Sequence, residues 1–210
     1  MRHAIAFVLT AAFCAASAAN LRSADSKLEK QGEVMAHFYE NPSKEAFDKF
    51  QKDILEFESF FKKHPQASFL LAVFIAKVSE KYGYPIGDTS FAEMAGKILD
   101  PRSKLGKFVN GDNVSPTKLD VWWACFFASG DDKYLEKIFR FVGKDTSKNR
   151  DVSQLMIYGA ANWSFKSNCK QHEKVMEFAK AKLEKGGLSQ TAREFLESCV
   201  NQKMDAAPGK

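Results

Sequence analysis

The stretch from Leu119 to Ala128, LDVWWACFFA, is apolar at nine of its ten positions. A helix that is apolar on all sides has no solvent face, so this segment is predicted to lie in the middle of the protein. Ser115 is suited to cap the helix, Pro116 to occupy its first position, and Gly130 to end it in a left-handed conformation. The pattern therefore predicts a buried central helix between Pro116 and Gly130.

Amphipathic segments precede this central helix. Lys27–Tyr39 has apolar residues at helical spacing and is predicted to be a helix. The next helix is expected to have Asn41 as its cap and Pro42 at its first position, and to run to about Lys63. Its apolar residues recur at spacings of three and four, which indicates one continuous buried face. The residues of that face are Phe47, Phe50, Ile54, Phe57 and Phe61.

A third helix is predicted over Ser68–Lys81, where the run FLLAVFIA again lacks a broad polar face. His64-Pro65 separates it from the helix before. After a turn-rich loop, a short helix is expected to end at Leu99. Residues 101–109 fit either one more short helix or an ordered loop.

The second half of the chain contains a weak internal repeat. Phe127-Ala128-Ser129-Gly130 matches Phe165-Lys166-Ser167-Asn168 at a shift of 38 residues. In each copy a residue that tolerates a positive φ angle, Gly130 or Asn168, is expected to join a more apolar helix to a more amphipathic one. Helix pairs repeated at such a period are typical of tetratricopeptide-like α-solenoids. We therefore expect an all-α fold whose C-terminal half stacks antiparallel helix pairs as a right-handed TPR-like α-solenoid.

The N-terminal residues are typical of a secretory signal peptide. Arg2 precedes an apolar run, Ala4–Ala16, and small residues allow cleavage after Ala18 or Ala19. The run is too short to span a membrane, so no integral membrane segment is expected in the mature chain. The expected location is the periplasm of a bacterium, with the extracellular space as the alternative.

The predicted organisation is a single domain between two unstructured ends. A chain of 210 residues with 45% apolar residues can bury a sizeable core. A polar linker and a disordered tail are expected to flank that core. The predicted segments are a signal peptide over 1–19, a linker over 20–26, a helical domain over 27–203 and a tail over 204–210. Within the domain, N-terminal helices occupy 27–109 and helix-pair repeats occupy 115–203.

Net charge and cysteine content bear on the possible partners and on disulfide formation. Loss of Arg2 takes the net charge from +5 to +4, which gives little support for a nucleic-acid partner. Three cysteines remain, and in an oxidising compartment this odd count suggests one bridge and one buried thiol. Cys125 lies inside the apolar helix, which leaves Cys169 and Cys199 as the candidate disulfide. The expected hairpin offsets these two by about 9 Å along a helix, so only a skewed crossing of the last helix would join them.

The sequence contains no set of motifs that predicts a catalytic or a cofactor-binding site. Cys169-x-x-His172 could supply two metal ligands, with Cys199 as a third, but a zinc site normally has tighter paired motifs, so no metal is predicted. Trp122 and Trp123 could stack on sugars, although their helix favours core packing. A basic stripe fits a solvated helix face better than an anionic partner. The stripe comprises Lys133, Lys137, Arg140 and Lys144.

The second half resembles a family of uncharacterised exported bacterial proteins. The resemblance lies in WWACFFASGDDKYLEKIF, in the F-x-S-[GN] pattern, and in the succession of Trp-Ser-Phe, Ser-Asn and His from Trp163 to His172. It covers roughly residues 115–185. It implies an all-helical, repeat-like exported protein and transfers no catalytic residue.

These observations favour a protein–protein interaction module without catalytic activity and without a cofactor. The alternatives are an inhibitor or immunity-type binder of a secreted enzyme, and a carrier or enzyme whose small-ligand site is made from scattered residues. In the helix that begins near Asp151, Gln154, Tyr158 and Asn162 recur at every fourth residue. Amide and phenol groups suit recognition, so this polar stripe is the candidate partner-binding surface, with packing inside the stack as the alternative.

Overall fold

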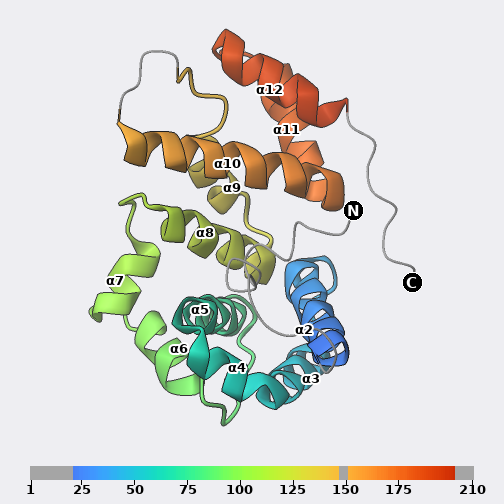
Figure 1. Cartoon of the computed structure of the whole chain (residues 1–210), viewed down its shortest axis with the longest axis vertical. Helices are drawn as coiled ribbons and strands as arrows, with labels where there is room; N and C mark the ends of the chain where they lie inside the picture. The colour runs from blue at the N-terminus through green and yellow to red at the C-terminus, as the bar shows by residue number, and fades with distance from the viewer. Residues whose placement is uncertain (1–20, 147–150, 202–210) are drawn as a thin grey trace. The chain divides into compact units, whose positions relative to one another are not determined.

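The computed structural model describes residues 21–146 and 151–201 (Figure 1). Within these ranges the chain is built from helices and turns and contains no β-strand, which confirms the all-α prediction. The predicted signal peptide and C-terminal tail lie outside the described residues.

The described residues form two compact units that share one helix. Unit 1 comprises the residues up to Asn113 together with Trp123–Gly130. Unit 2 comprises Val114–Trp122 and the residues from Asp131 onward. The central helix α8 (Pro116–Ser129) therefore contributes its first turns to unit 2 and its last turns to unit 1.

Unit 1 is arranged around α5. The side chains of α5 are buried on most sides, as the predicted lack of a polar face requires. Phe74 of α5 packs edge-to-face against Phe38 and Phe50, at centroid distances of 5.6 and 5.2 Å. The elements are α2 (Leu21–Ala36), η1 (Phe38–Glu40), α3 (Lys44–Ile54), η2 (Leu55–Phe57), α4 (Glu58–Lys63), α5 (Pro65–Tyr82), α6 (Ala92–Leu99) and α7 (Lys104–Asn110).

Two helix starts in unit 1 differ from the prediction. Residues 21–26 belong to α2, so this part of the segment expected to be a polar linker is helical. Helix α3 is capped by Ser43, whose hydroxyl accepts a hydrogen bond from the amide of Ala46 at 3.1 Å. Asn41 and Pro42 therefore lie before the helix, because a serine directly after proline satisfies the free amide one turn later.

The long predicted second helix is divided by a 3₁₀ turn. Phe47, Phe50, Ile54 and Phe61 are buried as predicted, whereas Phe57 is half-buried. The turn η2 separates α3 from α4 and shifts the helical phase between the two parts of the stripe.

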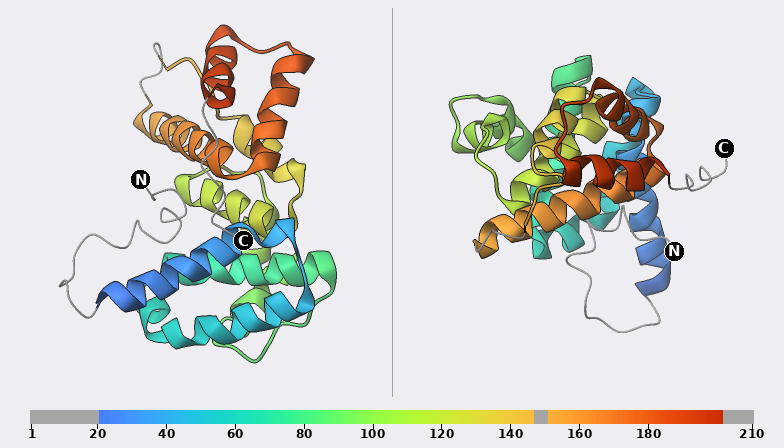
Figure 2. Two further views of the ribbon diagram at one scale, coloured as in Figure 1. Left: turned by 90° about the vertical axis from the view of Figure 1, so that its right-hand side faces the viewer. Right: turned by 90° about the horizontal axis from the view of Figure 1, so that it is seen from above.

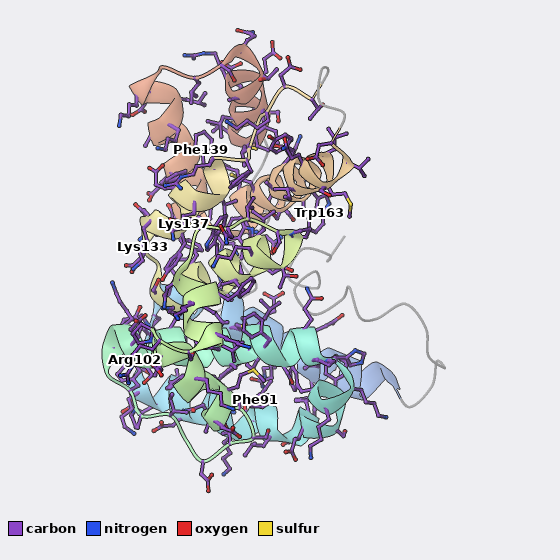
Figure 3. All side chains as sticks on the ribbon, turned by 90° about the vertical axis from the view of Figure 1, so that its left-hand side faces the viewer. Phe91, Arg102, Lys133, Lys137, Phe139 and Trp163 are labelled. Carbon is purple, nitrogen blue, oxygen red and sulfur yellow. The ribbon has the colours of Figure 1, made fainter. Side chains whose placement is uncertain are left out.

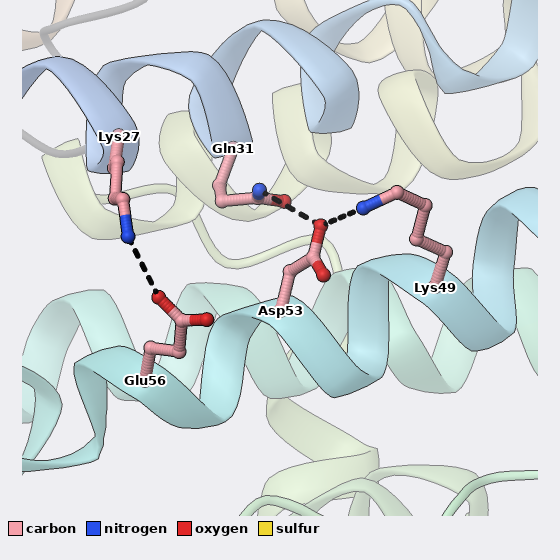
Figure 4. Close-up of polar contacts among 5 residues, drawn as sticks. All are labelled: Lys27, Gln31, Lys49, Asp53 and Glu56. Carbon is pink, nitrogen blue, oxygen red and sulfur yellow. Dashed lines mark hydrogen bonds and ion pairs between the residues drawn. The ribbon is translucent and has the colours of Figure 1, made fainter.

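Polar contacts join α2 to the helix beside it (Figure 4). Lys27 pairs with Glu56 at 3.3 Å, and Gln31 donates to Asp53 at 3.3 Å. Lys49 also donates to Asp53, and this hydrogen bond lowers the pKa of the Asp53 carboxyl group. Gln31 thus joins α2 to α3, and Lys27 joins α2 to the following turn η2. The exposed Lys27–Glu56 pair adds little stability, because water screens it.

Residues 101–109, for which the sequence fits either a helix or a loop, contain most of helix α7. Ser103 caps α7 by accepting a hydrogen bond from the Gly106 amide at 2.8 Å. Gly106 is required there, because a Cβ at this position would overlap the carbonyl group of Asp100. Buried Lys77 of α5 reaches Asn110 at the end of α7 at 3.0 Å.

The boundaries of α8 are those predicted from the sequence. The Ser115 hydroxyl accepts a hydrogen bond from the Lys118 amide at 3.1 Å, and Gly130 follows the helix with a φ of 65°. Trp122 and Trp123 retain 1 and 2% exposure, so both lie in the core rather than on a surface that could stack on a sugar.

In unit 2, α11 packs against both α10 and α12 (Figure 2). The elements after α8 are α9 (Asp132–Phe139), α10 (Val152–Gln171), α11 (Glu173–Lys185) and α12 (Gln190–Val200).

The predicted hinge at Asn168 is wrong. This residue lies inside α10, where its amide donates a hydrogen bond to the Ser164 carbonyl at 2.9 Å. The chain turns at His172 instead, in an extended conformation with φ −125° and ψ 111°. Gly130 and Asn168 are therefore not equivalent, because the buried asparagine continues its helix while the glycine ends one.

Candidate interaction surface

Helix α10 presents an apolar stripe to solvent. Val152, Met156 and Trp163 have exposed fractions of 68, 61 and 45%, and Gly159 between them is exposed as well. Spacings of four, three and four residues place these positions on one face of the helix. Figure 3 labels Trp163 on this helix. We call Val152, Met156, Gly159 and Trp163 the outer stripe.

The opposite face of α10 forms part of the core of unit 2. Ile157, Ala161 and Phe165 are buried on that face. The Phe165 ring has neighbours on three other helices and lies 6.2 Å from the ring of Phe178. One face of α10 thus packs into the core, and the outer stripe lies on the opposite face, where Val152, Met156 and Trp163 are exposed.

Gly159 has no packing role within the described chain. A Cβ added to it would meet no atom within 4 Å. Glycine inside a helix destabilises it relative to alanine by about 0.5 to 1 kcal/mol. The close approach that glycine permits is therefore not used by any described element of this chain.

The polar stripe predicted for partner binding lies at the edge of the buried face. Tyr158 and Asn162 each directly follow a buried residue and are themselves half-buried, whereas Gln154 is exposed. The Tyr158 hydroxyl donates to the Gln154 side chain at 3.4 Å.

Asn162 is engaged inside unit 2. Its side-chain oxygen accepts a hydrogen bond from the Gly143 amide at 2.8 Å. The Gly143 carbonyl in turn accepts one from the Thr191 hydroxyl at 2.8 Å. Asn162 thereby holds the chain after α9 against α10 and the start of α12.

The two candidate bridge cysteines lie together. Cys169 and Cys199 are buried free thiols in hydrogen-bonding contact. The Cys169 sulfur also lies 3.9 Å from the carbonyl oxygen of Val175. Helix α12 contacts α10 as well as α11, so the offset expected from a simple hairpin does not separate the thiols.

The environment makes Cys199 the more acidic thiol of the pair. A hydrogen bond from Cys169 lowers the pKa of Cys199 against the opposing effect of burial, and Lys166 and Ser198 act in the same direction. The same hydrogen bond, together with burial, raises the pKa of Cys169. Of the two buried thiols, Cys199 therefore has the larger thiolate fraction and is the one expected to attack a disulfide that reaches the pair.

We expect oxidised glutathione to convert this pair into a disulfide. The Cys199 thiolate attacks the reagent and releases one reduced glutathione, and Cys169 then displaces the second and closes the bridge. Since the pKa of Cys199 is lowered, the rate should rise with pH and level off below the pH at which an ordinary thiol would. The bridge should stabilise the chain by about 3 to 4 kcal/mol.

Alkylation of the denatured protein without reduction measures the outcome. In the oxidised mature chain only Cys125 should be labelled, and Cys199→Ser should leave Cys169 free to react as the control. Labelling of all three thiols after oxidation would contradict the predicted pairing.

Of the predicted basic stripe, only Lys133 and Lys137 lie on α9, because the helix ends at Phe139, before Arg140 and Lys144. Lys133 lies 3.3 Å from the carboxylate of Asp131 and over the ring of Tyr134. The ammonium of Lys137 lies 5.9 Å from the ring centroid of Trp122. Figure 3 labels both lysines. These contacts give the two cations neighbours inside their own unit.

The fold and this surface define an all-helical protein with an outward apolar helix face. No family model, curated protein or solved structure matches the chain. Among the described residues, no helix is both long and apolar enough to cross a membrane. The function is therefore inferred from the side chains and their contacts.

The outer stripe is the feature that sequence reasoning missed. Its signal is present in the sequence, because α10 has apolar residues on two opposite faces. Gly159 near the middle of the helix marks the exposed one. The polar stripe was predicted as the binding face because the sequence of α10 alone does not show which of its two apolar faces packs inward.

Proposed function

We propose that this protein is an exported, periplasmic helical-repeat module that binds another protein through the outer stripe of α10 and has no catalytic activity of its own. Export is supported by the signal-peptide pattern at the N-terminus.

The clustering of exposed apolar side chains carries this proposal. Six large hydrophobic residues are exposed in the described part of the chain, and three of them share the outer stripe. The other three are Val34, Leu55 and Phe108, which lie on separate elements. Single exposed apolar residues are ordinary, whereas a contiguous patch marks an interaction site. Trp and Met are also enriched where proteins meet.

We further propose that unit 2 is a right-handed TPR-like solenoid. The one-residue connection at His172 and the packing of α11 on α12 support this assignment. In such repeats, a helix of each pair is available for ligand binding. A crystal structure of the mature chain in which successive helix pairs rotate in the left-handed sense would contradict it.

Photo-crosslinking in cells tests the interaction. Benzoylphenylalanine in place of Trp163 keeps an aromatic group on the outer stripe, and the same group in place of Phe108 is the matched exposed control. We expect an adduct with a protein chain from position 163 and none from 108.

Two double variants assign the contact to one stripe. Met156→Gln with Trp163→Gln should abolish the adduct formed by a crosslinker at position 152, at near-normal stability. Gln154→Ala with Tyr158→Ala should leave that adduct unchanged. The opposite pattern would move the binding surface to the polar stripe, and loss with neither variant would reject both surfaces.

A further inference from the structure

We propose that the outer stripe of α10 pairs with the same stripe of a second copy of this chain, antiparallel, with Trp163 of each copy seated on Gly159 of the other. This inference rests on the proposed function, since it names the partner of the same surface.

The outer stripe continues as a regular seam to the end of α10. Lys166 and Lys170 extend it at the next spacings of three and four residues, and both are half-buried. Alternating spacings of three and four are those of helices that pack side by side. The complete seam is Val152, Met156, Gly159, Trp163, Lys166 and Lys170.

This seam is complementary to itself when reversed. An antiparallel copy centred between Gly159 and Trp163 places each of these two residues opposite the other. The largest side chain of the seam then meets the position that has no side chain. The same register sets Met156 against the partner's Lys166 and Val152 against the partner's Lys170, where apolar groups meet the aliphatic stems of lysines.

Reversed pairing gives a role to Gly159, against which no element in the described part of the chain packs. Open space surrounds the Cβ position of Gly159, so its own unit gains nothing from the missing side chain. A second helix can approach closely at such a position, and an indole ring fills the space above it. Because the contact is two-fold symmetric, one glycine and one tryptophan supply two identical knob-and-hole contacts.

Charge also favours the antiparallel arrangement. Asp151 lies at the N-terminal end of α10, and Lys170 lies at its C-terminal end. Antiparallel copies bring these opposite charges together at both ends and also oppose the helix dipoles. A parallel pair would instead place Lys166 and Lys170 beside their own copies, where like charges repel.

The seam is only about five helical turns long, which limits the strength of the contact between the two copies. One helix pair buries less surface than the roughly 1,200 Å² at the lower end of stable interfaces, so a reversible dimer is expected. Self-association should therefore depend on concentration and should be strongest where the exported chain is concentrated.

Sedimentation of the mature chain over a range of concentrations tests the pairing. The wild type should pass from monomer to dimer, and Trp163→Gln should raise the dimer Kd about tenfold or more. Gly159→Gln should also raise the Kd while it raises the thermal midpoint of the dilute monomer, because it removes a helical glycine. Phe108→Gln is the control and should dimerise normally. A strictly monomeric wild type, or a dimer unaffected by Gly159→Gln, overturns the inference.

The benzoylphenylalanine variant at position 163 fixes the register. In a mixture of isotopically light and heavy protein, mixed-mass crosslinks should map to the segment around the partner's Gly159. Crosslinks that map around the partner's Trp163 would indicate a parallel pair and overturn the inference. If the chain is monomeric but crosslinks a different protein in cells, self-pairing fails and the proposed function stands. If position 163 yields no adduct of either kind, both fail.

Discussion

Replacing Trp123 with alanine is expected to lower the free energy of unfolding by about 3 to 5 kcal/mol, as when a large aromatic leaves a packed core. The Trp123 ring retains 2% exposure. It stacks on Phe127 at 5.7 Å and meets Phe126 edge-on at 6.0 Å. Truncation would leave these two rings facing a cavity that the surrounding helices can fill only in part.

Urea denaturation followed by circular dichroism measures this effect. Trp163→Ala is the matched control, because it removes the same side chain from an exposed position and should cost less than about 1 kcal/mol at low protein concentration. Equal midpoints for Trp123→Ala and the wild type would show that α8 is not part of the core of unit 1.

Gly143→Ala should destabilise the chain by about 2 to 5 kcal/mol, which combines left-handed strain with overpacking. Gly143 has a φ of 61°, and a Cβ there would overlap the backbone of Ala192 in α12. The chain would have to move away from α12, which would stretch the hydrogen bonds that Gly143 makes with Asn162 and Thr191.

Gly83→Ala separates the two contributions. Gly83 has a φ of 70° and ends α5, but a Cβ added to it would meet no atom within 4 Å. It should therefore cost only the left-handed strain of about 1 to 2 kcal/mol. Thermal unfolding of both variants measures the difference, and equal losses would show that α12 is not packed closely on Gly143.

Local signals predicted the elements whose ends depend on adjacent residues. Helix α8 starts and stops as expected, because Ser115, Pro116 and Gly130 act within one turn of it. Helix α5 ends before Gly83, close to the predicted Lys81, but it begins at Pro65, three residues before the predicted Ser68. Proline occupies the first turn of this helix and does not form a break before it. Such boundaries are set by backbone geometry and need no tertiary contact.

Boundaries that depend on burial were not predictable in this way. Asn168 was expected to turn the chain because isolated asparagine tolerates positive φ, but inside unit 2 it is buried and bonds back to its own helix. Likewise, Lys118 lies at the start of α8 and is fully buried, although a lysine is normally expected on the surface. In both cases the conformation or position of the residue depends on its burial in the folded unit, which the adjacent residues do not show.

The candidate sites also depend on tertiary contacts that the local sequence does not show. The expected export and the odd number of cysteines predicted the pairing of Cys169 with Cys199. Whether the helices cross closely enough for it is a tertiary property, and here the thiols are in contact. For α10, the sequence left Asn162 with two interpretations, recognition of a partner or packing inside the stack. Its hydrogen bond from the Gly143 amide, 19 residues away, favours packing.

The hydrogen bonds of Gly143 also bear on how unit 2 assembles. They join positions separated by 19 and 48 residues, whereas helical bonds join positions four apart. Loop-closure entropy must be overcome before such distant contacts add stability, so the start of α12 is expected to dock after the local helices have formed. Until that docking occurs, Cys199 is carried on an unpacked segment. External oxidants would then reach this cysteine before α12 docks, and the docking step that forms the hydrogen bond from Thr191 to Gly143 would bury it.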